Sequence, residues 1–290
     1  MIKLTTLGFP RIGANRELKK SVEKYWKGQL SEIELKETAN NIKISNWNLH
    51  IKNNIDYIPN DFSYYDHILD ASCTFGNIPP RYNHDGSDVD LDLYFSMARG
   101  KQSGDTDVVA MEMTKWFDTN YHYIVPEFDS NTEFKLSYYK IFEDYKLAKD
   151  NGIETKPVLI GPISYLYLEK SKDSSNKYAL LDNLVDCYTQ ILTKLNELGC
   201  KDIQIDEPIL SLDLEDEVKT LYKNTYSKLD KSRGAINIHL ASYFESYADN
   251  FSIVDNLPVY SVHFDITRSK DNIEFVKLLS TQKKISLGVI

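Results

Sequence analysis

Residues 178–208 read YALLDNLVDCYTQILTKLNELGCKDIQIDEP, a helical pattern followed at once by a strand pattern. Apolar residues recur three or four positions apart in the first part, which is the spacing of one buried helix face. They are Leu181, Leu184, Val185, Tyr188, Ile191, Leu192, Leu195 and Leu198. Gly199 is the residue type that most often ends a helix in the left-handed conformation. Apolar and polar residues alternate over 202–206, as in a strand with two different faces. The stretch therefore predicts a helix packed on a strand, the repeating unit of an α/β fold.

Short apolar runs of this kind recur along the whole chain, and helical patterns separate them. The candidate strands are 3–8, 55–59, 122–128, 157–161, 202–206, 235–241, 259–265 and 284–290. A Ser-x-x-Glu capping box at 31–34 marks the start of a helix between the first two. Strands and helices that alternate this regularly indicate a parallel sheet. Eight strands in 290 residues favour a closed (β/α)8 TIM-type barrel over an open sheet.

The chain ends on the eighth predicted strand, where a complete barrel would add a covering helix. We therefore expect residues 1–290 to form one barrel that belongs to a longer protein. The region 81–112 contains the polar stretch 84–90, and we interpret it as an elaborated loop on one face of the barrel.

Composition narrows the class of function. Lys and Arg number 34 against 43 Asp and Glu, and the net charge of −9 argues against nucleic-acid binding. The longest apolar runs are only strand-sized, so we expect no membrane span. The three cysteines, Cys73, Cys187 and Cys200, form no Cys-x-x-Cys pair, and the N-terminus has no signal-peptide pattern. We therefore expect a cytoplasmic monomer in a reducing compartment.

A group of cations follows the first predicted strand. The turn TLGFPRIG at 6–13 precedes an expected helix whose first turns carry Arg16, Lys19 and Lys20. Positions i, i+3 and i+4 share one helical face, and a helix N-terminus adds unpaired N–H groups and partial positive charge. The pattern suits a multiply charged anion, although an ordinary solvated face has the same pattern.

A second candidate anion contact is Lys115, just before the third predicted strand. It is followed by Trp116 and Phe117, and Tyr121 and Tyr123 come soon after. These rings could form a flat wall for a planar ligand, or they could pack into an ordinary aromatic cluster beside a solvated lysine.

Polar side chains also recur on three neighbouring predicted strands. Those expected to point into the barrel are Gln204, Asp206, Asn237, His239, Ser261, His263 and Asp265. Such a set could act in catalysis or bind a metal, and it could equally be a hydrogen-bonded polar core. The spacing of His239, His263 and Asp265 is not diagnostic of a metal site.

Several of these motifs resemble cobalamin-independent methionine synthases. They are 8–13 with 16–19, 113–117 with 120–123 and 126–128, 157–162, and 204–208. The resemblance runs in order along essentially all of the chain. It implies a longer enzyme of two facing (β/α)8 barrels that transfers a methyl group from 5-methyltetrahydropteroyltri-L-glutamate to L-homocysteine. It also implies a catalytic zinc, and no cobalamin, with the His, Cys and Glu zinc ligands and the homocysteine pocket in the C-terminal barrel.

This chain resembles the N-terminal barrel of those enzymes. The resemblance carries the contacts with the folate polyglutamate tail onto Arg16, Glu17, Leu18, Lys19 and Lys115. Clustered Arg and Lys suit such a tail because each added glutamate brings a carboxylate. We expect no catalytic residue and no metal site in this chain, and no methyl transfer by this chain alone.

Two other functions stay open. One is a stand-alone TIM-barrel metal hydrolase or decarboxylase that uses Asp206, His239, His263 and Asp265. The other is a binding module without catalytic activity. A tightly held, stoichiometric metal would favour the first of these two.

Overall fold

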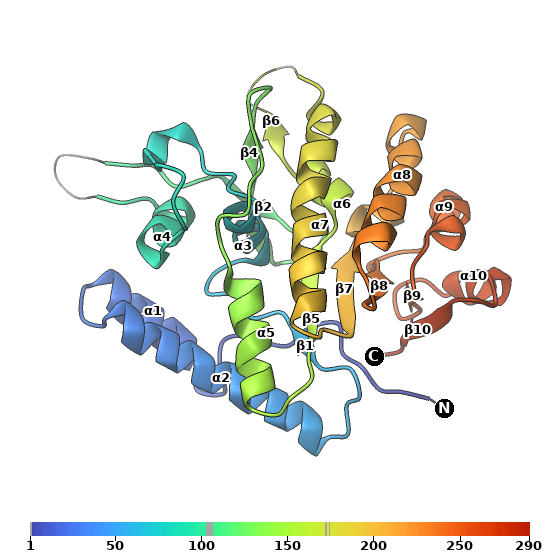
Figure 1. Ribbon diagram of the computed structural model, residues 1–290, viewed down its shortest axis with the longest axis horizontal. Coiled ribbons are helices and arrows are strands. Elements are labelled where there is room, and N and C mark those ends of the chain that lie inside the picture. Colours follow the sequence, from blue (N-terminus) through green and yellow to red (C-terminus); the bar gives the residue numbers. More distant parts are fainter. Residues whose placement is uncertain (1, 103–106, 172, 174) are drawn as a thin grey trace. The chain divides into compact units, whose positions relative to one another are not determined.

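The structure, a computed structural model, describes residues 2–102, 107–171, 173 and 175–290. It divides into two units, each of which is described by itself (Figure 1). Unit 1 comprises Met1–Val125 and Ser137–Pro157, and unit 2 comprises Pro126–Leu136 and Val158–Ile290.

Unit 1 is mainly helical. Its described elements are α1 (Glu17–Trp26), α2 (Glu32–Lys52), β1 (Pro59–Asn60), α3 (His67–Thr74), η1 (Pro80–Tyr82), α4 (Leu91–Arg99), β2 (Met113–Lys115), β3 (His122–Ile124), α5 (Lys140–Asp150) and the first two residues of β5 (Lys156–Ile160). β1 pairs in parallel with the start of β5. The predicted first strand, 3–8, contributes one parallel bridge, between Thr5 and Tyr57.

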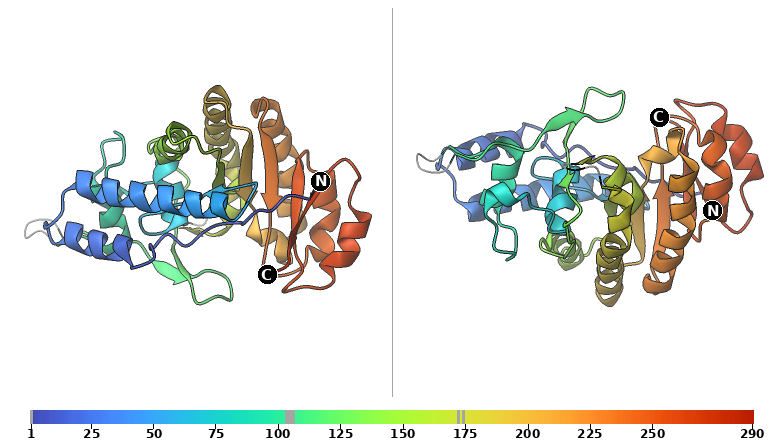
Figure 2. Two further views of the ribbon diagram at one scale, coloured as in Figure 1. Left: turned by 90° about the horizontal axis from the view of Figure 1, so that it is seen from below. Right: turned by 90° about the horizontal axis from the view of Figure 1, so that it is seen from above.

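Helices α1 and α2 lie side by side, as the left view in Figure 2 shows. The predicted capping box at the start of α2 is confirmed, because the Ser31 hydroxyl accepts from Glu34 N and the Glu34 carboxylate accepts from Ser31 N. Leu18 of α1 and Leu35 of α2 are almost fully buried in the same apolar cluster. This packing fixes α1, and with it the cationic segment at the start of α1.

Unit 2 contains most of the parallel sheet. Its described elements are β4 (Glu127–Phe128), the rest of β5, α6 (Pro162–Tyr167), β6 (Lys170–Ser171), η2 (Lys177–Leu180), α7 (Leu181–Glu197), β7 (Asp202–Asp206), η3 (Pro208–Ser211), α8 (Asp216–Ser232), β8 (Asn237–Ala241), η4 (Ala248–Asn250), α9 (Phe251–Asn256), β9 (Ser261–Asp265), α10 (Asn272–Leu278) and β10 (Lys284–Gly288). Neighbouring strands pair in parallel in the order β5, β7, β8, β9 and β10.

The decisive stretch 178–208 folds as predicted. Helix α7 is followed by Gly199 with a φ of 79° and then by β7. The isoleucines of β7, Ile203 and Ile205, are fully buried, and α7 packs against α8 along the sheet (Figure 1). Together these elements give an α/β fold with a parallel sheet.

Besides the predicted strand 3–8, which forms only a single bridge, two further regions differ from the sequence-based expectation. The predicted strand 122–128 is split, since β3 forms an antiparallel hairpin with β2 whereas β4 pairs in parallel with β6. The region 81–112 is more than a loop, because it contains α4, whose N-cap Asp90 accepts a hydrogen bond from Leu93 N. Within that region, 103–106 lie outside the described residues.

Candidate functional site

The Gly/Pro turn after the first predicted strand is anchored to residues that precede α3. Phe9 N donates to Asp61 Oδ2 over 2.8 Å. A Cβ on Gly8 would lie 2.5 Å from the same oxygen, so any larger residue would have to displace the Asp61 carboxylate. Arg11 donates from Nη1 to Tyr64 O over 3.1 Å, and this arginine therefore stabilises the turn.

The turn ends at a residue in the left-handed conformation. Arg16 has a φ of 61° and is the N-cap of α1, which begins at Glu17. The prediction that Arg16, Lys19 and Lys20 share a helical face is therefore wrong for Arg16, which lies outside the helix. The sequence pattern missed this because positive φ is uncommon for a residue with a Cβ.

The Glu17 carboxylate holds this left-handed turn closed. It accepts from Asn15 N over 2.9 Å and from Asn15 Nδ2 over 3.2 Å. A Cβ on Gly13, where φ is 81°, would lie 2.2 Å from Glu17 Oε2. Backbone N–H groups, first its own and then that of Asn15, lower the pKa of Glu17. The carboxylate therefore organises the turn that precedes the cations of α1.

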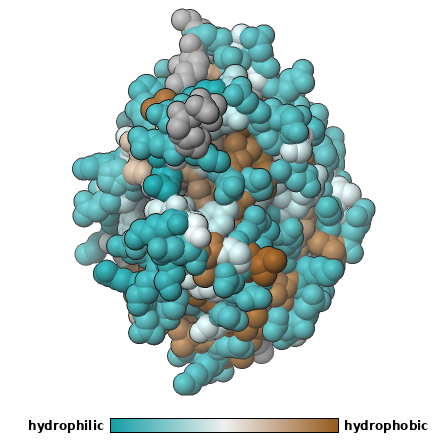
Figure 3. Space-filling model, turned by 90° about the vertical axis from the view of Figure 1, so that its left-hand side faces the viewer, coloured by the Kyte–Doolittle hydropathy of each residue, from teal (hydrophilic) through white to brown (hydrophobic). Residues whose placement is uncertain are grey.

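The next two residues of the segment point in different directions. The Leu18 side chain is 1% exposed and belongs to the core, so only its backbone can reach a ligand. The Lys19 side chain is 56% exposed, and its Nζ lies 3.8 Å from Glu23 Oε1. The face of the molecule with α1 and α4 is mostly hydrophilic, with small separate hydrophobic patches (Figure 3).

Lys115 lies on the antiparallel hairpin β2–β3. It is exposed, whereas Trp116 and Tyr123 are 6% and 7% exposed and have ring centroids 5.5 Å apart. The His67 and Trp116 rings also pack in a T-shaped arrangement, at 5.0 Å between centroids. These two buried rings form a packed aromatic cluster instead of a wall for a planar ligand.

All five sequence-predicted binding residues belong to unit 1. Four are consecutive at the start of α1, and Lys115 is on the hairpin. In the described part of unit 1, no hydrogen bond or ion pair joins Lys115 to that α1 segment.

The polar residues of unit 2 form a chain of hydrogen bonds. His239 Nε2 lies 2.8 Å from Asp202 Oδ1, and His239 Nδ1 lies 2.7 Å from Ser261 Oγ. The order Asp, His, Ser is that of a catalytic triad. However, Ser261 is 4% exposed, and both Asp202 and Ser261 begin their strands. Barrel enzymes place their chemistry at the other ends of the strands. We interpret the chain of bonds as a polar core.

The other members of the predicted inward set have partners as well. Asp206 Oδ2 accepts from Tyr243 OH over 3.3 Å, and His263 Nδ1 lies 2.9 Å from Ser286 Oγ. The Asp265 carboxylate accepts from backbone and hydroxyl groups of the turn that follows β9. These contacts are typical of structural residues.

Sequence reasoning missed the role of Glu207, which directly follows β7. Its side chain is fully buried and accepts from Ser164 N over 2.9 Å and Ser164 Oγ over 2.6 Å. The hydroxyls of Tyr222 and Tyr226 donate to it over 3.4 and 3.3 Å. Burial raises the pKa of Glu207 to about 7. Tyr222 and Tyr226 lie four positions apart, which places both hydroxyls on one face of α8. That spacing alone does not predict that their partner is Glu207.

The resemblance assigns the zinc to the C-terminal barrel, and the described residues of this chain offer no set of ligands that fits a zinc ion. In the ranges 2–102, 107–171, 173 and 175–290, no three His, Cys, Asp or Glu side chains are grouped to hold a metal. All three cysteines are buried, and burial raises the pKa of Cys187 to about 11, which disfavours the thiolate. Nor is any helix of the described chain long and apolar enough to cross a membrane.

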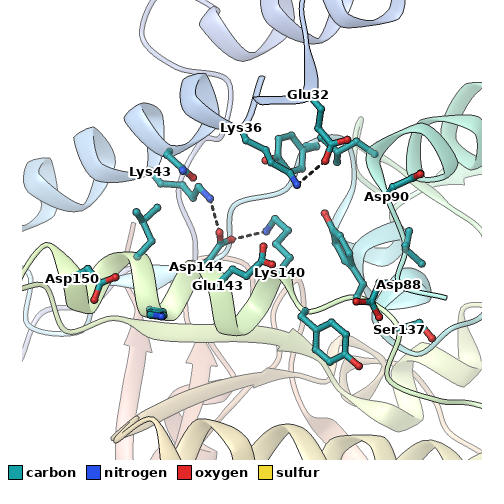
Figure 4. A pocket seen from close by; sticks show the side chains of 18 residues that line it. Glu32, Lys36, Lys43, Asp88, Asp90, Ser137, Lys140, Glu143, Asp144 and Asp150 are labelled. Atoms are coloured by element: carbon teal, nitrogen blue, oxygen red, sulfur yellow. Dashed lines mark hydrogen bonds and ion pairs between the residues drawn. The ribbon is translucent and has the colours of Figure 1, made fainter. Parts of the chain in front are cut away.

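A cavity of about 500 Å³ lies in unit 1 between α2 and α5 (Figure 4). Lys43 and Lys140 both form ion pairs with Asp144, which lines the cavity with them. Burial by itself would raise the pKa of Asp144, but the positive charges of Lys140 and Lys43 outweigh burial and lower that pKa. None of the five sequence-predicted binding residues lines this cavity. We interpret the ion pairs as a structural link between the two helices.

The fold and the site define an α/β domain that presents exposed lysines on one helix and on one hairpin. The family model described as "Cobalamin-independent synthase, N-terminal domain" matches residues 3–290. The chain therefore belongs to this family, which confirms the predicted resemblance.

Relatives named 5-methyltetrahydropteroyltriglutamate–homocysteine methyltransferase match at high identity. The Salinibacter ruber protein is 45% identical over 281 residues, which cover 94% of this chain and 36% of the relative. The Flavobacterium johnsoniae protein is 45% identical over 295 residues, which cover 100% of this chain and 38% of the relative. The chain thus spans well under half the length of these relatives.

Solved structures support the barrel fold. A Listeria monocytogenes structure assigned to the vitamin-B12-independent methionine synthases superposes with a TM-score of 0.62, over 99% of this chain and 80% of that one, at 14% identity. A B12-independent methionine synthase from a Shewanella species gives a TM-score of 0.57 at 15% identity, over 90% of this chain and 73% of that one. At these identities the likeness shows the fold, and the parallel α/β sheet is consistent with the predicted TIM barrel.

Proposed function

We propose that this chain is the folate-binding half of an enzyme that makes L-methionine. The enzyme transfers the methyl group of 5-methyltetrahydropteroyltri-L-glutamate to L-homocysteine, and this half binds the polyglutamate tail. The support is the family, whose relatives carry that name at 45% identity, together with the exposure of Lys19 and Lys115. The proposal assigns zinc and homocysteine to the part of the relatives' length that this chain does not span.

The residues of the proposed tail site have different roles. The ammonium groups of Lys19 and Lys115 bind tail carboxylates, and the long Arg16 side chain adds a third cation. Glu17 carries the wrong charge for a tail contact, and it acts by holding the turn through its bonds to Asn15. Leu18 contributes its backbone, since its side chain is buried.

Tail contacts of this kind act far from the reacting methyl group. They use the binding energy of a remote part of the substrate to place the methyl donor. We therefore expect this chain to bind the folate without transferring its methyl group. Methyl transfer to homocysteine by this chain alone would contradict that part of the proposal.

The test compares single lysine variants by calorimetric titration. We expect Lys19→Ala and Lys115→Ala each to weaken binding of the triglutamate folate about three- to tenfold, which corresponds to the loss of about 1 kcal/mol for one contact at an exposed site. Binding of the monoglutamate should change little. Lys24→Ala is the matched control, because Lys24 is another exposed lysine of α1. Unchanged triglutamate binding in both test variants would refute the assignment of the tail site.

A further inference from the structure

The register of the β2–β3 hairpin places one more side chain beside Lys115. Trp116 N donates to Tyr121 O over 2.8 Å, and Val125 N donates to Glu112 O over 2.8 Å. In an antiparallel ladder, hydrogen-bonded pairs alternate with non-hydrogen-bonded pairs. Lys115 is paired directly with His122, and this alternation makes it a non-hydrogen-bonded pair.

Side chains approach each other most closely in a pair of this kind. They project from the same face, with Cβ atoms about 4.5–5.5 Å apart. Both Lys115 and His122 are exposed. Within the described chain, neither side chain has an ion pair or a side-chain hydrogen bond. The ammonium group and the imidazole therefore present two nitrogen donors together to the solvent.

The opposite face of the hairpin holds this pair in a fixed orientation. Trp116 and Tyr123 are buried on that face, and Trp116 packs against His67. Asp66 Oδ2 accepts from Ile124 N over 3.0 Å and from Leu69 N over 2.9 Å, which ties β3 to the first turn of α3. Because the hairpin backbone is already anchored, only the two side chains lose freedom when a ligand binds.

We propose that His122 is a further tail-binding residue that acts together with Lys115. The two side chains take the oxygens of one tail carboxylate, or of two successive ones, from the same face of the hairpin. This inference rests on the proposed function, because it deepens the assignment of Lys115. It makes His122 a residue that increases the affinity for folates with longer polyglutamate tails over those with shorter ones.

The test is a series of substitutions at residue 122, titrated with the mono- and triglutamate forms of 5-methyltetrahydrofolate. We expect His122→Gln to weaken triglutamate binding about threefold and His122→Glu about tenfold or more. His122→Lys should bind at least as tightly as the wild type. Monoglutamate binding should change less than twofold throughout the series. A purely structural role would instead weaken all three variants without regard to charge.

Two controls separate the possible failures. His84→Gln alters another histidine of unit 1, one that bonds to Ser87 O, and should leave the tail preference unchanged. Thermal unfolding of every variant checks that the chain remains folded. If Lys115→Ala weakens triglutamate binding and the residue 122 series does not follow charge, the inference about His122 is wrong and the proposed function stands. If Lys19→Ala, Lys115→Ala and the residue 122 series all leave the tail preference unchanged, both the inference and the proposed tail site are wrong.

Discussion

Replacing Glu207 with glutamine is predicted to remove a large pH dependence of stability. The carboxyl group is fully buried among Ser164, Tyr222 and Tyr226. Glutamine has the same shape and keeps one oxygen for the bonds from Ser164 and Tyr222, its amide nitrogen can donate to the Tyr226 hydroxyl, and it cannot ionise. The comparison of the two chains therefore isolates the cost of placing a negative charge at this position.

The magnitude follows from the pKa of Glu207, which burial raises from 4.5 to about 7 in the folded chain. The folded state then holds a proton that the unfolded state has lost, in the window between pH 4.5 and 7. Stability therefore falls as the pH rises through that window. Between pH 5 and 8.5 the loss attributable to this group is about 2–3 kcal/mol.

The assay is urea unfolding of the wild type and Glu207→Gln at pH 5 and pH 8.5. Other groups also titrate in this range, so the informative quantity is the change with pH in the difference between the two proteins. That difference should shift by about 2–3 kcal/mol in favour of the variant at pH 8.5. Glu197→Gln, at the exposed end of α7, is the control. Its stability relative to the wild type should change between pH 5 and pH 8.5 by less than about 0.5 kcal/mol. A pH-independent difference for Glu207→Gln would refute the argument that burial raises this pKa.

Two further predictions concern the turn before α1 and the polar core of unit 2. Gly13→Ala should lower the free energy of unfolding by about 1 kcal/mol more than Gly28→Ala, and it should weaken triglutamate binding. Both glycines have positive φ, but only at residue 13 would a Cβ displace the Glu17 carboxylate from Asn15. Equal losses in denaturant unfolding would contradict this account. His239→Ala should cost about 2–3 kcal/mol, because Asp202 and Ser261 lose a shared partner, and should leave folate binding unchanged. Impaired binding with intact stability, seen by titration and thermal unfolding, would favour a functional role for this histidine.

The fold of unit 2 could be predicted closely from the sequence. Buried strands such as Asp202–Asp206 and amphipathic helices such as Leu181–Glu197 carry strong periodic signals, and these two elements agree with the prediction to within a few residues. The capping box at Ser31 is a local motif with its own hydrogen bonds, and it was predicted for the same reason.

Features that depend on backbone details or on distant partners could not be predicted in this way. The left-handed Arg16 interrupts what reads as continuous helical spacing. The split of 122–128 into two strands depends on which neighbour each half meets, and Met113–Lys115 is too short for a periodic signal. The burial of Glu207 against α8 likewise depends on tertiary packing. The positions of the proposed tail-binding residues along the chain came from the family resemblance, and the structure adds which of their side chains are exposed.

The most direct test of the central claim is calorimetric titration of this chain with the mono- and triglutamate forms of 5-methyltetrahydrofolate, each at low and moderate salt. The account predicts that the triglutamate binds more tightly and that its advantage shrinks as salt rises, because exposed cations bind the extra carboxylates. Equal affinity for the two folates, or no binding of the triglutamate, would contradict the claim that this chain carries the tail site.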